Sequence, residues 1–136
     1  MRPSIQRGKI IRVNVGAHMD AIPSDDPYKL GGRPFLVIQQ DLLNHYSDRT
    51  LVAVVTASPK KIAVFKDGGA SVLLHPSKAL LLEKESLVDC ALIHIMYDKD
   101  VTEVSTQVCD SSIMSKIDKA LRFVMDLDPD RVLDPR

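Results

Sequence analysis

The sequence predicts a mainly β fold that is followed by a single C-terminal helix. Short apolar segments rich in β-branched residues, separated by Gly, Pro, Asp and Ser, recur along most of the chain and are typical of strands. Near the C-terminus the apolar spacing changes to the helical period. Many short strands followed by one packing helix indicate a small, strongly bent barrel or sandwich.

Length and composition predict one soluble globular domain. The chain has 136 residues, of which 45% are hydrophobic and 26% are charged, so residues 1–136 can bury one core. Its 18 basic and 18 acidic residues cancel. Attraction to an anionic partner must therefore come from a local cluster of charge rather than from the whole molecule.

Other features of composition bear on compartment and redox chemistry. The first residues lack the apolar core of a signal peptide, and no run is long enough to span a bilayer. Cys90 and Cys109 stand alone, without a CxxC pattern or a histidine at ligand spacing. We therefore expect a cytoplasmic protein with two reduced thiols, no membrane contact and no disulfide.

The first strand is predicted over residues 9–15, where Ile11, Val13 and Val15 alternate with polar residues. Residues 16–32 follow as a long loop rich in Gly, Pro and Asp. Loops of this length in compact domains are usually functional or disordered. The loop ends in Gly-Gly and leads directly into Arg33.

Two apolar strands are predicted next, over residues 34–40 and 50–57. Both are rich in β-branched and aliphatic residues, as strands buried on both faces are. Pro34 is compatible with the first position of a strand but not with its centre. Further short strands are predicted at 60–65, 70–75, 78–82 and 86–96, with a turn at 66–70 between two of them.

The helical period begins at Asp110. Ile113, Ile117, Ala120, Leu121 and Val124 recur at helical spacing within residues 110–128. Asp110, Ser111 and Ser112 offer side-chain oxygens for the N-cap, and Pro129 ends the helix. We expect an ordered core over about residues 6–127 and a loosely held tail over 128–136.

Standard catalytic motifs are absent from the sequence. It has no phosphate-cradling glycine loop, no nucleophile elbow and no His/Glu set at metal spacing. The four histidines stand far apart, at positions 18, 45, 75 and 94. The sequence therefore predicts neither a metal nor a cofactor.

The ordered series of segments resembles the MazF/PemK/Kid toxin family. The similar segments are QRGKIIRVNV, GGRPFLVIQQDLLN, TLVAVVTAS, LLEKESLVDCALIHI and MSKIDKALRFVMDL, which together span about residues 6–127. The resemblance implies the small SH3-like barrel of the MazF/CcdB-like plasmid-maintenance toxins. It also implies a homodimer that cleaves single-stranded RNA without a metal, leaving 2′,3′-cyclic phosphate and 5′-hydroxyl ends. A cognate antitoxin would hold such a toxin inactive.

The same resemblance assigns candidate catalytic residues. The family's arginine, which precedes the proline of the second strand, corresponds to Arg33, and its threonine at the end of the third strand corresponds to Thr56. A fixed guanidinium suits the stabilisation of charge on a phosphate, and a hydroxyl suits its orientation. Two positions depart from the family. Tyr28 stands where an acid is usual, and His94 stands where an arginine is usual, two residues after an apolar Leu92.

Each candidate residue also has a purely structural interpretation. Arg33 alone would be an exposed turn residue, and Thr56 alone an ordinary strand residue. His94 is either a packed imidazole or a general acid or base near Arg33. Further candidates for the RNA-binding surface are Lys29, Lys60 and Lys61 for phosphates, and Gln39 and Gln40 for base edges; each is also compatible with a solvated surface or strand end.

Two other functions are compatible with the same fold. One is a MazF-like module that has lost cleavage and serves in binding or regulation. The other is a toxin that poisons DNA gyrase through protein–protein contact. The pairing of Arg33 with Thr56 favours the ribonuclease, because a gyrase poison would not need it.

Overall fold

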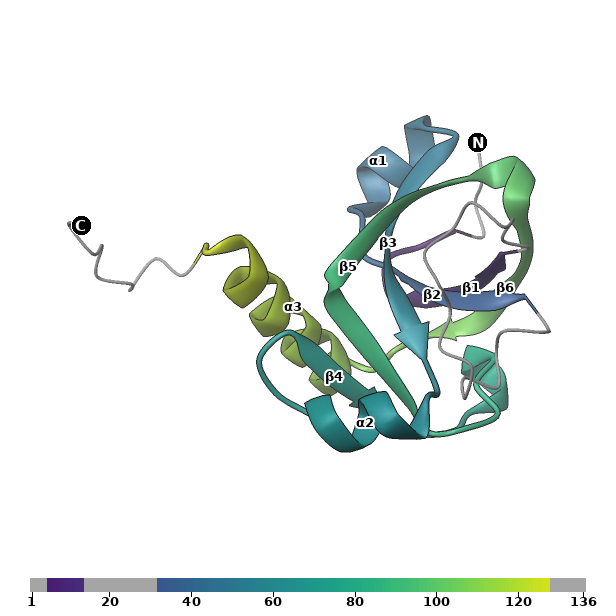
Figure 1. Ribbon diagram of the computed structural model, residues 1–136. Coiled ribbons are helices and arrows are strands. Elements are labelled where there is room, and N and C mark those ends of the chain that lie inside the picture. Colours follow the sequence, from purple (N-terminus) through teal and green to yellow (C-terminus); the bar gives the residue numbers. More distant parts are fainter. Residues whose placement is uncertain (1–4, 14–31, 128–136) are drawn as a thin grey trace.

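The computed structural model describes residues 5–13 and 32–127. Its sheet has six strands, and short helical segments lie in the connections (Figure 1). The elements in chain order are β1 (Lys9–Val13), β2 (Arg33–Val37), α1 (Asp41–Tyr46), β3 (Arg49–Thr56), α2 (Pro59–Phe65), β4 (Ser71–Leu74), the 3-10 turn η2 (Lys78–Leu80), β5 (Ser86–Tyr97), the 3-10 turn η3 (Asp98–Asp100), β6 (Val101–Val108) and α3 (Ser111–Met125).

The strands form one antiparallel sheet in the order β4-β5-β3-β2-β1-β6. The sheet curls strongly, and the long strand β5 runs along much of its height (Figure 1). Among the described residues no ladder joins β4 to β6, so the curled sheet is a half-barrel rather than a closed one. The predicted mainly β fold with a C-terminal helix is thus confirmed.

Each face of the sheet carries its own hydrophobic core. On one face α3 inserts Ile117 and Ala120 among strand residues such as Leu36 and Val55. On the opposite face, Phe35 lies among Ile5, Ile11, Val13, Val37, Val52, Val54 and Met96, with Leu92, Val101 and Val104 packed against them. Strands β2 and β3 are therefore buried on both sides, as their apolar sequences predict.

The C-terminal helix forms where the sequence predicts it. Asp110 caps α3, its Oδ1 accepting a bond of 2.9 Å from the backbone N–H of Ile113. The helix ends at Met125, and Asp126 adopts a left-handed conformation with φ of 59°. The predicted tail over 128–136 lies outside the described residues, as do residues 14 and 15 of the first predicted strand.

The strand predicted at 60–65 is wrong, because this segment is the helix α2. Ser58 caps the helix, its Oγ accepting a bond of 3.3 Å from the backbone N–H of Lys61. Pro59 occupies the first turn, where its missing N–H costs no hydrogen bond. This Ser-Pro start outweighs the β propensity of Ile62 and Val64.

The strand predicted at 78–82 is also wrong. Residues 78–80 form η2, and Leu82 makes only an isolated bridge with Ser77. The turn at 66–70 is present, but it joins α2 to β4 instead of joining two strands. Lys66, Gly68 and Gly69 have positive φ there, which bends the chain back toward the sheet.

Besides the short 3-10 turn η3, two elements are absent from the sequence prediction, α1 and β6. The six-residue α1 begins at Asp41, after a Gln40 whose side chain makes no cap hydrogen bond. The strand β6, with the sequence VTEVSTQV, lies at a sheet edge, and most of its residues are exposed or half-buried. Neither segment carries a strong apolar period, which explains why the pattern does not reveal them.

None of the helices in the described part of the chain combines the length and apolar character needed to cross a membrane.

Candidate functional site

Arg33 is the first residue of β2, where it pairs with Val13 of β1. Only 6% of its surface is exposed. This burial excludes the solvated-turn interpretation of the arginine that follows Gly-Gly. Because a buried guanidinium is costly unless it is held by polar groups, its place at the start of a core strand marks it as a candidate binding group.

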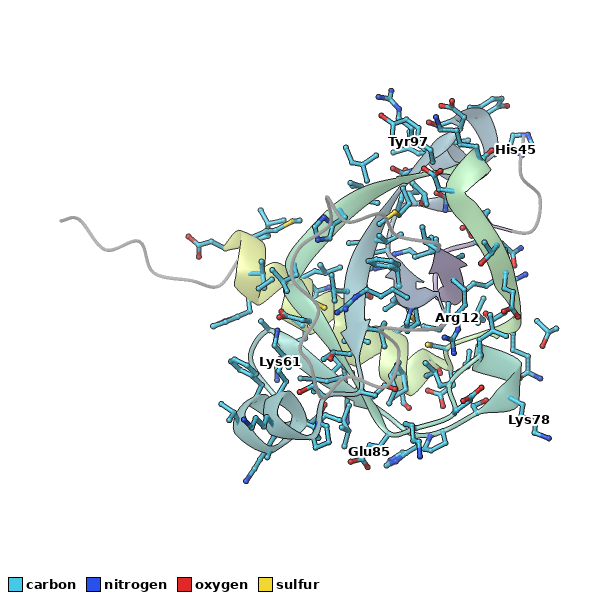
Figure 2. The ribbon with its side chains drawn as sticks, turned by 45° about the vertical axis from the view of Figure 1, so that its right-hand side comes forward. Arg12, His45, Lys61, Lys78, Glu85 and Tyr97 are labelled. Carbon is cyan, nitrogen blue, oxygen red and sulfur yellow. The ribbon has the colours of Figure 1, made fainter. Side chains whose placement is uncertain are left out.

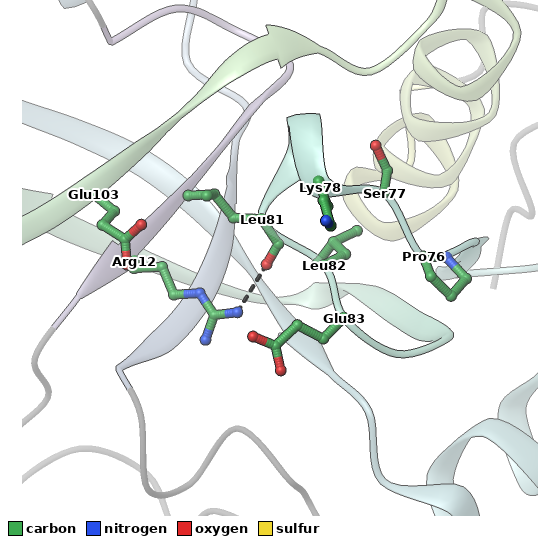
Figure 3. A pocket seen from close by; sticks show the side chains of 8 residues that line it. All are labelled: Arg12, Pro76, Ser77, Lys78, Leu81, Leu82, Glu83 and Glu103. Carbon is green, nitrogen blue, oxygen red and sulfur yellow. Dashed lines mark hydrogen bonds between the residues drawn. The ribbon is translucent and has the colours of Figure 1, made fainter.

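Two features fix the backbone just before Arg33. Gly32 has φ of 79°, a conformation that residues with a side chain rarely adopt. Its carbonyl oxygen accepts a bond of 2.9 Å from Nη1 of Arg12. Nη2 of Arg12 donates to the carbonyl oxygen of Leu81 at 2.8 Å, and so joins the start of β2 to the segment after η2 (Figure 3).

Arg12 lies in a pocket of about 590 Å³ that also contains Lys78, Glu83 and Glu103 (Figure 3). Two carboxylates line this pocket, and two carbonyl oxygens already hold the Arg12 guanidinium. Its charge balance therefore does not favour an anionic ligand. We therefore assign Arg12 a structural role, in which its guanidinium holds the backbone at Gly32, directly before Arg33.

Thr56 lies on the same face of the sheet as Arg33. Side chains alternate along a strand, so Arg33 shares the face of Phe35, and Thr56 shares the face of Val54. Phe35 and Val54 are direct cross-strand partners. Continuing this register toward the ends of both strands brings Arg33 opposite Thr56. Thr56 is 2% exposed, and its Oγ1 accepts a bond of 3.2 Å from the backbone N–H of Ser58.

His94 joins this face from β5. It pairs with Val52 of β3, and its ring meets Phe35 edge-on, with centroids 6.4 Å apart and planes at 76°. Its side chain is half-buried. The three catalytic candidates Arg33, Thr56 and His94 thus come from three adjacent strands and share one face.

An irregularity in β5 is what brings His94 to this face. Ala53 pairs with Ile93, but the next residue of β3, Val54, pairs with Asp89 instead of Leu92. Residues 90–92 are therefore inserted, and an odd number of inserted residues switches the side to which later side chains point. The carboxylate of Asp89 holds the insertion, since its Oδ1 accepts a bond of 2.9 Å from the backbone N–H of Ala91.

Asp89 also lies on the Arg33 face, because it pairs with Val54. No motif in the sequence distinguishes this residue. Strict alternation through the strand predicted at 86–96 places positions 89 and 94 on opposite faces. Only the three-residue insertion puts both residues on the same side of the sheet, and no feature of the sequence predicts that insertion.

The candidate RNA-binding residues lie in different places. Lys60 and Lys61 occupy the first turn of α2, which begins three residues after Thr56. Figure 2 shows Lys61 at the α2 end of the molecule, apart from Arg12 and Lys78. Gln39 follows the far end of β2, where its Nε2 donates to Asn44 Oδ1 at 2.9 Å and to the carbonyl oxygen of Arg49 at 3.1 Å.

Gln40 is exposed and directly precedes α1. Lys29, Tyr28 and nearly all of the loop at 16–32 lie outside the described residues. The structure thus places Arg33, Thr56 and His94 on one face of the sheet, with His94 opposite a residue four positions along β3 from Thr56, and it places Lys60 and Lys61 near Thr56. Gln39 and Gln40 follow the opposite end of β2 from Arg33.

Cys90 and Cys109 lie in the hydrophobic core between the sheet and α3, and not on the face of the sheet that carries Arg33. Burial raises the pKa of Cys90 to about 12 and that of Cys109 to about 11, with a smaller contribution from a neighbouring aspartate in each case. Both thiols are therefore protonated at neutral pH and are poor nucleophiles. Within residues 5–13 and 32–127, no three His, Cys, Asp or Glu side chains gather in a geometry suited to a metal ion.

The arrangement combines a buried guanidinium, a hydroxyl, an imidazole and a carboxylate on one face. A guanidinium binds and stabilises anionic oxygens, and an imidazole or a carboxylate transfers protons. Such a set suits reactions at a phosphodiester, where negative charge builds on the phosphate and one proton is taken up while another is released.

Comparisons with known proteins identify relatives of this chain. The profile of a family described as PemK-like, MazF-like toxin of type II toxin-antitoxin system matches residues 6–125. Endoribonuclease MazF6 of Mycobacterium tuberculosis and endoribonuclease MazF2 of Mycobacterium bovis are each 33% identical to the chain over 95 residues, which cover 70% of this chain and 79% of theirs.

Solved structures share the fold at lower identity. A mycobacterial endoribonuclease in complex with its cognate antitoxin superposes with a TM-score of 0.66 at 17% identity, covering 91% of this chain and 97% of that one. The Mycobacterium tuberculosis toxin MazF-mt6 superposes with a TM-score of 0.58 at 16% identity, covering 88% and 98%.

Proposed function

Because the chain belongs to the family of PemK-like, MazF-like toxins of type II toxin–antitoxin systems, we propose that it is an endoribonuclease that cleaves single-stranded RNA without a metal ion. The observation that carries this proposal is the burial of Arg33 on the face that it shares with Thr56 and His94. A binding module without catalysis would need a cationic surface but not a buried guanidinium on the same face as a hydroxyl and an imidazole.

The proposed reaction is an internal transesterification of the RNA backbone. The 2′-oxygen attacks the adjacent phosphorus, the bond from phosphorus to the 5′-oxygen breaks, and the products are a 2′,3′-cyclic phosphate and a 5′-hydroxyl. Negative charge builds on the non-bridging oxygens during this step. The guanidinium of Arg33 stabilises that charge, and the hydroxyl of Thr56 orients the phosphate.

Arg33 is unsuited to act as a base, because a guanidinium stays protonated in proteins. We assign His94 to protonation of the departing 5′-oxygen, since imidazole is the side chain that exchanges protons near neutral pH. Its edge contact with Phe35 holds the ring on the face of Arg33. Lys60 and Lys61 at the start of α2 extend the cationic path beyond Thr56, and Lys29 and Gln39 remain proposed RNA contacts.

We further propose that the protein is a homodimer that works in the cytoplasm and binds an antitoxin. The apolar pair Leu51 and Ile95, opposite each other on β3 and β5, is 36% and 54% exposed, and Tyr97 beside it is 42% exposed. Apolar surface of this kind is typical of protein contacts. One structural neighbour was solved with its cognate antitoxin, which favours a partner of the same type here.

The test is cleavage of a long single-stranded RNA by the purified protein in the presence of EDTA, with mapping of the 5′ ends. We expect discrete cuts that leave 5′-hydroxyl ends and persist in the chelator. An RNA that carries a 2′-deoxynucleotide on the 5′ side of a mapped cut is the matched control and should stay intact there. Cleavage that vanishes with EDTA and returns with magnesium would refute the proposed mechanism, and binding without any cleavage would favour the regulatory module.

Assembly is tested separately by sedimentation at micromolar concentration. We expect a stable dimer, and replacement of Ile95 by Asp should weaken it, because a carboxylate would enter the apolar pair with Leu51. A wild-type protein that sediments as a monomer would refute the proposed homodimer.

A further inference from the structure

Asp89 is a half-buried carboxylate on the face that carries Arg33, Thr56 and His94. It lies opposite Val54 of β3 and opposite Ser71 of β4. Its Oδ1 accepts the backbone N–H of Ala91, and the described residues provide no partner for its Oδ2. One oxygen therefore shapes the strand, and the other is available to a ligand.

The register places Asp89 between the other candidates. Thr56 lies two residues along β3 from Val54, so it is the diagonal neighbour of Asp89, and diagonal neighbours in an antiparallel pair have Cα atoms about 7–8 Å apart. Val52, the partner of His94, lies two residues from Val54 in the other direction. Asp89 therefore lies between the levels of Thr56 and His94, so a sugar–phosphate unit bound over Val54 has Thr56 on one side, His94 on the other and Asp89 beside it.

We propose that Asp89 is the general base of the reaction and that its Oδ2 accepts the proton of the attacking 2′-hydroxyl. This role rests on the proposed ribonuclease function. The proton passes from the 2′-oxygen to the carboxylate as the 2′-oxygen bonds to phosphorus. The bond to the 5′-oxygen breaks as that oxygen receives a proton from His94. One proton is taken up and one is released, so the step requires no further reactant.

The alternative is that Asp89 serves only to hold the insertion at 90–92. Asp89→Asn separates the two roles, because the amide oxygen of asparagine still accepts the Ala91 N–H, whereas the side chain no longer takes up a proton. The matched control is Asp100→Asn, which removes the same charge from an exposed residue of η3. Asp89→Glu keeps the carboxylate but displaces it by one methylene.

The experiment measures kcat on RNA, the Kd for the uncleaved 2′-deoxy analogue and the hydrogen-exchange protection of the Ala91 amide. For Asp89→Asn we expect kcat to fall by about 10²–10⁴-fold, with the Kd within threefold of wild type and Ala91 still protected. Asp89→Glu should recover part of that loss, and Asp100→Asn should cleave like wild type.

Cleavage by Asp89→Asn at the wild-type rate would overturn the role as base and leave the proposed function intact. A loss that appears in the Kd and not in kcat would also overturn it. A wild-type protein that binds RNA but does not cleave it would instead overturn the proposed function and this role together.

Discussion

Nη2 of Arg7 donates to Oδ1 of Asp118 at 2.6 Å, and this ion pair joins the segment before β1 to the C-terminal helix α3. Nε of the same side chain donates to the carbonyl oxygen of Ile38 at 2.9 Å, just beyond β2. The backbone N–H of Arg7 donates to Asp41, the first residue of α1. One arginine thus connects its own segment to the β2–α1 connection and to α3, three regions that are distant in sequence.

Replacing Arg7 should cost more stability than replacing its partner. The side chains are 29% and 43% exposed, so Asp118→Asn should lower the free energy of unfolding by less than about 1 kcal/mol. Arg7→Met also removes the donor to Ile38 and should cost about 1–3 kcal/mol. Urea unfolding of both variants tests this order, and equal losses would contradict it.

Asn44 should be among the most sensitive polar residues of the fold. Its side chain is buried, with 1% of the residue exposed. Its Oδ1 accepts bonds from Thr50 Oγ1 at 2.7 Å and from Gln39 Nε2 at 2.9 Å. Its Nδ2 donates to the carbonyl oxygen of Gln39. Asn44→Ala leaves the buried Thr50 hydroxyl without this acceptor and should cost about 2–3 kcal/mol in urea unfolding. Gln40→Ala, four positions away on an exposed residue, is the control and should change stability by less than about 0.5 kcal/mol.

Asp67 should contribute to acid unfolding. The backbone N–H of Leu73 and then Lys116 hold the pKa of its carboxyl below the ordinary value of 3.8. A carboxyl with a lowered pKa stabilises the folded state fully above its unfolded pKa, and that stabilisation is lost as the pH falls through the folded pKa. Asp67→Asn should therefore lower the Tm at neutral pH and flatten its decline between roughly pH 4 and pH 2. Thermal scans across that interval give the comparison, and parallel curves for both proteins would argue against the role of Asp67. The effect should be small, because the Asp67 side chain is 38% exposed.

Local pattern predicted those parts of the fold in which pattern and packing agree. The strand at Phe35 and the helix with Ile117 and Ala120 carry clear periods, and the structure buries the same faces. The segment after Ser58 carried conflicting signals, and the cap with Pro59 outweighed its β propensity. The placement of Asp89 and His94 on the same face depends on an insertion in β5 that only the pairing with β3 defines. Resemblance therefore predicted Arg33 and Thr56 as site residues, whereas the proposed carboxylate Asp89 could be found only from the pairing of the strands.

The last prediction concerns Arg33, whose burial and position carry the proposed function. If its guanidinium stabilises charge that builds on the phosphate, Arg33→Ala should lower kcat by about 10²–10³-fold while RNA binding weakens far less. Arg33→Lys should recover little of this loss, because an ammonium group cannot reproduce a two-pronged contact with phosphate oxygens.

The control for Arg33 is Arg49→Ala, which removes an exposed arginine at the opposite end of β3 from Thr56 and should leave kcat unchanged. Circular dichroism and sedimentation must first establish that each variant folds and assembles like wild type, since the Arg33 side chain is buried. A folded Arg33→Ala protein that cleaves RNA at the wild-type rate would show that this arginine supports the strand and takes no part in the chemistry.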